Sequence, residues 1–293
     1  MTAVAAELPA RRESVAARVA RIVLKAPLNL LLMAVGLLWL VPTIGLFITS
    51  ILPASIAEQS GWWKIFSKPS IVTWSNYDAL LHDSGLLSAL KTTAYIAVGN
   101  TVAVVVIGAM AGYALAWLEF PGRDWVLVGV IGLLVVPLQM ALIPMFSLYD
   151  KLHIFDTVLS IILFHVAFGL PFAVFLLRNF FVGIPKDILE SARIDGASEF
   201  WIFLRLMLPL GLPAIASLAI FQFLWTWNDL IVALTFGQNT QPITVWIFGQ
   251  LREFGTSIDV IAPASFISLV VPLAVFFAFQ RYFVQGLLAG SVK

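Results

Sequence analysis

The sequence contains no cysteine, and only 11% of its 293 residues are charged. The absence of cysteine excludes disulfides, thiolate catalysis and metal sites built from thiolates. Soluble domains carry about 25% charged residues. A chain with less than half that share has too few charged side chains to cover the surface of a water-soluble domain. The net charge of +1 provides no basic field to attract nucleic acid, and we therefore expect no nucleic-acid partner.

Local patterns for nucleotide, metal and hydrolase chemistry are also missing. The chain has no G-x-x-x-x-G-K-[ST], H-E-x-x-H or G-x-S-x-G pattern. Its three histidines, His82, His153 and His165, lack metal-ligand spacing, and we interpret His165 as a packed, hydrogen-bonded side chain. We therefore predict no cofactor, no metal site and no catalytic residue. Any ATP that drives this protein must be bound by another chain.

Long apolar stretches are what the sequence has instead. Hydrophobic residues make up 61% of the chain, and the mean hydropathy is +0.99. A helix needs about 20 apolar residues to cross the hydrocarbon core, where it satisfies its own backbone polar groups. We therefore predict an all-α protein of the lipid bilayer with six transmembrane helices. The predicted spans are Leu28–Leu52, Leu86–Leu118, Trp125–Tyr149, Phe155–Leu177, Leu210–Phe236 and Ile261–Phe283.

The basic residues predict the orientation, because cytoplasmic segments of membrane proteins are enriched in Lys and Arg. With the N-terminus inside, 12 of the 17 basic residues fall on inside segments, which places both termini in the cytoplasm. We interpret residues 1–27 as a basic cytoplasmic arm before a retained first span, because a signal-peptide core is only about 7–15 residues long. The five basic residues on outside segments are Lys64, Lys68, Lys91, Lys151 and Arg252.

Prolines interrupt several of the predicted spans. A proline inside a membrane helix frees a carbonyl group and kinks the axis. We interpret these kinks as features of bundle packing, and the alternative is a broken helix that lines a transport path. The prolines concerned are Pro42, Pro137, Pro144, Pro171 and Pro272.

The segment 179–209 is the longest predicted cytoplasmic connection. Pro185 suits the first turn of a helix, and Asp187 and Glu190 near its start complement the helix dipole. Gly196 interrupts the apolar periodicity and permits a positive φ. We therefore predict two short helices joined by a glycine elbow. One side of this unit is apolar and the other is charged, as a docking surface requires.

This segment resembles the E-A-A-x3-G-x9-I-x-L-P signature of ABC importer permeases. Glu190-Ser191-Ala192 is followed after three residues by Gly196, and nine residues later by Leu206-Met207-Leu208-Pro209. The departures are serine for alanine at 191 and leucine for isoleucine at 206. From residue 28 to residue 293 the chain resembles the sugar-importer branch, closest to the second permease of α-glucoside or maltose-like systems. The stretches that carry this resemblance include Thr73-Trp74-Ser75-Asn76-Tyr77, Phe120-Pro121-Gly122-Arg123, Leu170-Pro171-Phe172 and Trp227-Asn228-Asp229.

The resemblance implies the type I, MetI-like importer permease fold for residues 28–293, in a bacterial inner membrane. It implies a multi-pass transport subunit, not an enzyme, that forms half of a pore for an α-glucoside or related oligosaccharide. Its partners would be a second homologous permease, two cytoplasmic ATPase subunits and an extracytoplasmic sugar-binding protein. The residues that would contact the ATPase are Glu190, Ser191, Ala192, Asp195, Gly196, Ala197, Leu206 and Pro209.

Polar side chains near the end of the fifth predicted span are the candidate sugar path. Trp225, Asn228 and Asp229 are spaced i, i+3 and i+4, so they share one face of a helix. Asp229 is the one acid well inside a predicted span, and such acids are candidates for function. Its alternative role is an ion pair or a helix cap. The outer loop 237–260 is polar and long enough to contact the binding protein.

Two other classes of function compete with this interpretation. An ion-coupled secondary transporter normally needs buried ionisable residues on several spans, and only Asp229 qualifies. A membrane-embedded enzyme needs a nucleophile with its base, or a metal cluster, within the spans, and neither is evident.

Overall fold

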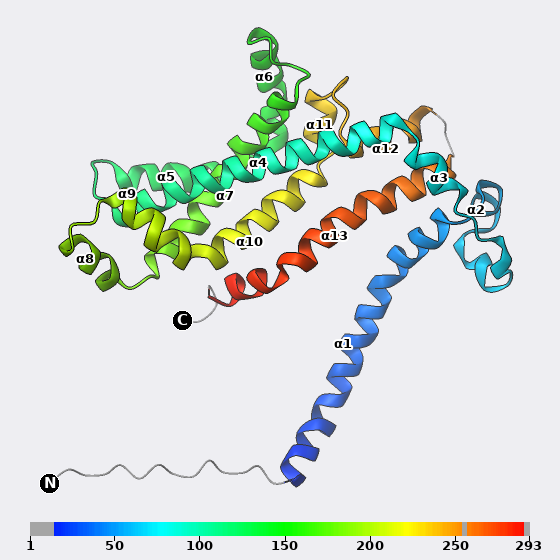
Figure 1. The fold of residues 1–293 in the computed structure, drawn as a ribbon, viewed down its shortest axis with the longest axis horizontal. Coiled ribbons are helices and arrows are strands. Elements are labelled where there is room, and N and C mark those ends of the chain that lie inside the picture. Colours follow the sequence, from blue (N-terminus) through cyan, green and yellow to red (C-terminus); the bar gives the residue numbers. More distant parts are fainter. Residues whose placement is uncertain (1–14, 254–256, 290–293) are drawn as a thin grey trace.

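The computed structural model describes residues 15–253 and 257–289, and this part of the chain is helical without strands (Figure 1). Residues 1–14 of the predicted arm lie outside the described residues, and the first helix already begins at Val15. The helices are α1 (Val15–Ser50), α2 (Ala54–Ser60), η1 (Trp62–Phe66), η2 (Pro69–Ile71), α3 (Ser75–Leu81), α4 (Ser84–Trp117), α5 (Arg123–Leu133), α6 (Leu138–Lys151), α7 (Val158–Val182), α8 (Lys186–Ile194), α9 (Glu199–Ile202), η3 (Phe203–Met207), α10 (Leu208–Trp227), α11 (Ile231–Phe236), α12 (Ile243–Glu253) and α13 (Ile258–Ala289).

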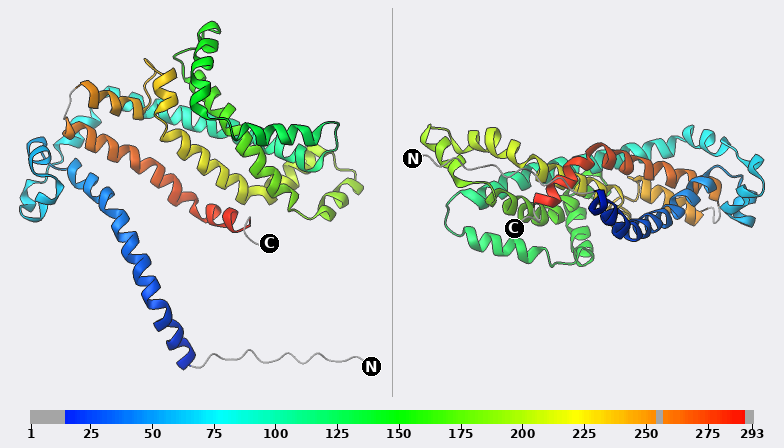
Figure 2. Two further views of the ribbon diagram at one scale, coloured as in Figure 1. Left: turned by 180° about the vertical axis from the view of Figure 1, so that it is seen from behind. Right: turned by 90° about the horizontal axis from the view of Figure 1, so that it is seen from below.

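Helices α4, α7, α10 and α13 form the bundle, and α1 leans away from it over most of its length (Figures 1 and 2). Helix α4 packs most closely on α7. A Cβ atom built on Gly108 would lie 2.8 Å from the Cβ of Ala173, and one built on Gly112 would lie 3.1 Å from the Cβ of Leu177. Small residues of this kind let helix backbones approach closely, which is how membrane helices gain van der Waals contact.

The end of α1 is closed by side chains of α3. The amide nitrogen of Asn76 donates to the carbonyl oxygens of Ser50 (3.0 Å) and Leu52 (2.9 Å), and the hydroxyl groups of Tyr77 and Ser50 are 2.7 Å apart. The last carbonyl groups of a helix have no hydrogen-bond donor within the helix, and the side chain of Asn76 provides donors at the end of α1. The Thr73–Tyr77 stretch therefore holds the end of α1 against the start of α3.

The predicted span Trp125–Tyr149 is divided into two helices, α5 and α6, in the structure. Helices α5 and α6 are long and apolar enough to cross a membrane only when they are taken together. Their axes differ by 100°. Pro137 lacks an N–H group and adopts an extended conformation (φ −65°, ψ 127°) at the start of α6. A proline also disfavours the helical conformation of the residue before it, which explains why the helix is interrupted between Leu133 and Leu138. The other five predicted spans each contain one helix long and apolar enough to cross a membrane.

The fifth predicted span also differs from the continuous helix Leu210–Phe236 that we expected. Its helix begins earlier, because α9, η3 and α10 form one continuous helix over Glu199–Trp227. The wide turn η3 lies just before Pro209, where a helix loses one backbone donor. The continuous helix ends at Trp227, and the short helix α11 follows after Leu230.

The segment 237–260, predicted as an outer loop, contains the helix α12. The backbone N–H of Ile243 donates to the hydroxyl of Thr93 on α4 (2.7 Å), and Ile243 and Trp246 are buried in a cluster with residues of α3, α4 and α13. The carboxylate of Asp156, before α7, accepts hydrogen bonds from the backbone N–H groups of Asn239 (2.9 Å) and Thr240 (3.2 Å). The described part of this segment is therefore held on the bundle.

Candidate functional site

The elbow between α8 and α9 is built by a glycine that ends α8. Gly196 has a φ of +81°, a value that residues with a Cβ atom rarely adopt. Its N–H donates to the carbonyl of Arg193, and the N–H of Ala197 donates to the carbonyl of Ala192, both at 3.0 Å. These two bonds form a Schellman motif, which closes the last turn of α8. The hydroxyl of Ser198 then accepts from the N–H of Trp201 (3.3 Å) and caps α9.

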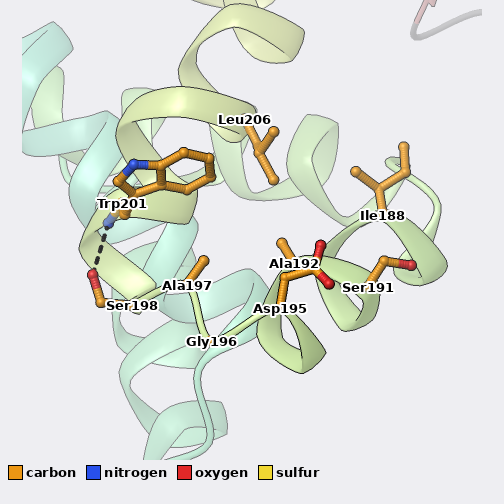
Figure 3. A pocket seen from close by; sticks show the side chains of 9 residues that line it. All are labelled: Ile188, Ser191, Ala192, Asp195, Gly196, Ala197, Ser198, Trp201 and Leu206. Carbon is orange, nitrogen blue, oxygen red and sulfur yellow. Dashed lines mark hydrogen bonds between the residues drawn. The ribbon is translucent and has the colours of Figure 1, made fainter.

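A hollow of about 760 Å³ lies in the angle of this elbow, and we call it the coupling hollow (Figure 3). Residues of α8 face residues of α9 and η3 across it, with Gly196 and Ala197 in the connection between them. Six of the eight predicted coupling residues line it. The lining residues are Ile188, Ser191, Ala192, Asp195, Gly196, Ala197, Ser198, Trp201 and Leu206.

Glu190 and Pro209 are the two predicted coupling residues outside the lining. The carboxylate of Glu190 pairs with the Nζ of Lys186 one turn earlier (2.6 Å). This pairing raises the pKa of the exposed Lys186 ammonium. Pro209 lies in the first turn of α10, where a proline is tolerated. Glu190 is thus on the charged outer side of α8. Pro209 lies in the helix that follows the hollow, at the start of α10.

Apolar side chains attach the elbow to the bundle. Leu189 of α8, Ile202 of α9 and Met207 of η3 are fully buried in one cluster with Leu177 and Phe181 of α7. Burying a leucine or isoleucine side chain contributes about 1.5–3 kcal/mol. The elbow is therefore part of the folded bundle and not a loose loop.

A polar network at the elbow was missed by the sequence analysis. The Nε of Arg193 donates to Oε1 of Glu199 (2.7 Å), and the hydroxyl of Tyr113 on α4 donates to Oε2 of Glu199 (2.5 Å). The carboxylate of Glu199 holds the pKa of Arg193 above its ordinary value, mainly through this hydrogen bond. No sequence signal links Tyr113 to Glu199, because 86 positions separate them.

Comparison with known proteins identifies the family. Residues 104–288 match the model of the binding-protein-dependent transport system inner membrane component family. The chain belongs to this family. It is therefore a multi-pass permease component of the inner membrane, as the apolar stretches and the resemblance together predicted.

Curated permeases of this kind are similar over most of the chain. The osmoprotective compounds uptake permease protein GgtD of Synechocystis sp. is 43% identical over 275 residues, which cover 92% of each chain. The alpha-glucoside transport system permease protein AglG of Rhizobium meliloti is 49% identical over 247 residues, 80% of this chain and 65% of that protein. These similarities confirm the predicted resemblance to sugar importer permeases.

Solved structures show the same fold. A chain of a bacterial ABC transporter involved in the import of the acidic polysaccharide alginate has a TM-score of 0.74 and 23% identity, covering 94% of this permease and all of that chain. A chain of the MetNI methionine ABC transporter in an inward-facing conformation has a TM-score of 0.56 and 18% identity, over 69% of this permease and 95% of that chain. The predicted MetI-like importer permease fold is confirmed.

The three predicted path residues lie together where α10 ends, but their side chains differ in environment. Trp225 is 38% exposed and its ring contacts His165 of α7, with 5.2 Å between the centroids. Asn228 is exposed and donates to the carbonyl of Leu224 (2.7 Å). The carboxylate of Asp229 accepts from the backbone N–H groups of Val232 and Ala233, so it caps α11.

Asp229 also faces a buried histidine. Its Oδ2 lies 3.7 Å from the Nε2 of His165, whose side chain is 1% exposed and whose Nδ1 is 2.9 Å from the carbonyl oxygen of Ile161. The interpretation of His165 as a packed, hydrogen-bonded histidine is confirmed. The structure thus shows the alternative role of Asp229 as a helix cap, and it places the buried His165 beside the carboxylate at the break between α10 and α11.

A second hollow, of about 300 Å³, lies between α7 and α10 next to Trp225. Gln222 lines it, and the side-chain oxygen of Gln222 accepts from the amide of Asn100 on α4 at 3.4 Å. The same amide donates to the hydroxyl of Thr226 (2.7 Å). The remaining lining residues are Phe168, Gly169, Phe172 and Phe221. The hollow thus combines aromatic faces with one amide, a combination that suits a sugar ring with hydroxyl groups.

Proposed function

We propose that this permease forms half of the pore of an ATP-driven importer for α-glucosides or related oligosaccharides. Its partners in this proposal are a second homologous permease, two cytoplasmic ATPase subunits and an extracytoplasmic sugar-binding protein. The observation that carries the proposal is the coupling hollow, which collects six of the eight predicted coupling residues in the angle of one elbow. The 49% identity to an alpha-glucoside permease supports the substrate class.

In this proposal the elbow of α8 and α9 docks in a cleft of an ATPase subunit. The exposed faces of Ile188 and Trp201 provide apolar contact, and Asp195 provides charge at the rim of the coupling hollow. ATP closes the ATPase dimer and draws the two elbows of the permease pair together, and the pore then favours its outward-open state. ATP shifts this equilibrium only as far as it binds one state better than the other.

The proposed sugar path comprises Trp225, Asn228 and Asp229, with Gln222 in the hollow beside them. Trp225 can cover the apolar face of a sugar ring, while the amide groups and the carboxylate exchange hydrogen bonds with hydroxyl groups. The position of Asp229 at a helix break supports this role, since broken membrane helices often line transport paths.

Reconstitution of the whole complex tests the proposed function. The permease, its partner permease and the ATPase subunits are placed in liposomes with the binding protein outside and ATP inside. We expect uptake of radiolabelled maltose or trehalose, and no uptake of the β-linked control cellobiose. Uptake should stop when either ATP or the binding protein is omitted.

The same assay separates the competing functions. Uptake that needs neither ATP nor the binding protein, but follows a proton or sodium gradient, would indicate an ion-coupled secondary transporter instead. ATP-driven uptake of another compound would keep the importer and overturn only the α-glucoside assignment.

Orientation is tested with single cysteines, because the chain has none of its own. Asp187 on α8 and Lys64 on η1 are both exposed, and the proposal places the first inside and the second outside. We expect a membrane-impermeant maleimide to label Lys64→Cys in intact cells and Asp187→Cys only after the membrane is opened. The reverse labelling pattern would overturn the predicted topology.

A further inference from the structure

The two arms of the elbow meet at one carboxylate, that of Glu199. Arg193 lies in the last turn of α8, and Glu199 is the first residue of α9. The 2.7 Å bond between them therefore spans the glycine connection and joins α8 to α9. Opening the angle of the elbow would therefore stretch this bond.

The same two side chains also hold the end of α4. Tyr113 donates to the second oxygen of Glu199 (2.5 Å), and the guanidinium of Arg193 donates to the carbonyl of Trp117 (3.3 Å). That carbonyl belongs to the last turn of α4, where helix carbonyls lack partners within the helix. The indole N–H of Trp117 donates in turn to the carbonyl of Phe181 on α7 (3.0 Å).

These contacts differ in kind from the apolar packing under the elbow. Buried leucine and isoleucine side chains resist separation, but their attraction has no fixed direction. Hydrogen bonds to charged groups are shorter and directional, so they fix the angle as well as the distance between elements. An isolated exposed ion pair contributes little, whereas this one belongs to a network over four helices.

We propose that Arg193, Glu199 and Tyr113 form a clasp that makes the elbow and the end of α4 move as one unit. Movement imposed at the coupling hollow is thereby passed to α4 instead of bending the elbow. The three are positioning residues, and none of them lines the coupling hollow. The inference rests on the proposed function, since it assumes that an ATPase moves the elbow.

Two conservative variants test the clasp in the reconstituted complex. Glu199→Gln keeps the shape of the side chain but removes the charge, and Tyr113→Phe removes only the hydroxyl and keeps the ring against Phe203. We expect ATPase docking to be unchanged and maltose taken up per ATP hydrolysed to fall about tenfold, as expected for losing a hydrogen bond to a charged group. Arg193→Lys, which keeps the charge, should restore part of the ratio lost in Arg193→Gln.

Matched controls make the same chemical changes away from the clasp. Asp124→Asn removes an exposed carboxylate from the start of α5, and Tyr95→Phe removes an exposed hydroxyl from α4. Both should keep the wild-type ratio of uptake to ATP hydrolysis. Docking itself is measured by co-purification of the ATPase with each variant.

The outcomes separate this inference from the proposed function. A wild-type complex without ATP-driven uptake refutes the proposed function and the clasp with it. A normal wild type with normal Glu199→Gln and Tyr113→Phe variants refutes the clasp alone. A proportional fall of uptake and ATP hydrolysis, or loss of ATPase docking, also refutes it, because the residues would then act on folding or on docking.

Discussion

Replacing Gly196 with proline is expected to abolish ATP-driven uptake while the permease still inserts in the membrane. Proline fixes φ near −65°, whereas the elbow requires +81°, and proline cannot donate the hydrogen bond to the carbonyl of Arg193. Both the turn and the Schellman motif are therefore lost, and the coupling hollow loses its shape. The measurement is maltose uptake in the reconstituted complex, with the amount of permease in the membrane determined by immunoblotting.

A graded variant and a matched control sharpen this test. No atom lies within 4 Å of a Cβ built on Gly196, so Gly196→Ala introduces only backbone strain, about 1–2 kcal/mol. That strain lowers the ratio of intact to distorted elbow about 5- to 30-fold. Gly122 has a φ of +84° and equal space, but it lies between α4 and α5. Gly122→Ala should transport normally, and wild-type uptake by Gly196→Pro would overturn the coupling role of the elbow.

Replacing Asp229 with alanine is expected to lower the maximal rate of uptake at least about tenfold, or 1.4 kcal/mol of barrier, with the complex still assembled. The variant loses the acceptors of the Val232 and Ala233 N–H groups, and the loss of a helix cap costs about 1 kcal/mol. It also leaves the buried His165 without its carboxylate neighbour and removes a polar group from the proposed path. The measurement is the initial rate at saturating maltose and at saturating trehalose.

Asp229→Asn distinguishes the cap from the path. Asparagine keeps an oxygen that can cap α11, so a residue that serves only as a cap should tolerate the change. A path role predicts a reduced rate or a changed preference between maltose and trehalose. Loss of assembly, or normal rates with both sugars, would refute the path role of Asp229.

Local patterns in the sequence were sufficient to predict the elbow and most of the membrane-spanning helices. Gly196 interrupts the apolar periodicity and predicted an elbow that permits a positive φ, and the structure has that turn. Apolar stretches of sufficient length predicted six spans, and five of these correspond to single helices long and apolar enough to cross a membrane. Both features depend on neighbouring residues, so they can be recognised in one sequence.

Features that depend on distant residues or on competing local preferences were not predictable in this way. Pro137 was recognised as an interruption, but the 100° bend depends on how α6 packs against α7 and α11. The helix α12 was hidden in a polar segment, because its burial depends on α4 and α13. The bond between Tyr113 and Glu199 required the full fold.

The close approach of α4 and α7 limits how this permease can change shape. At Gly108 and Gly112 the two helices leave no space even for an added methyl group, so one cannot slide past the other without a steric clash. Shear between packed helices is one of the two common routes to domain rearrangement, and hinge bending is the other. Alternating access in this chain is therefore expected to use hinges. The break between α5 and α6 and the break after Trp227 are two candidate hinges, because the backbone already bends there.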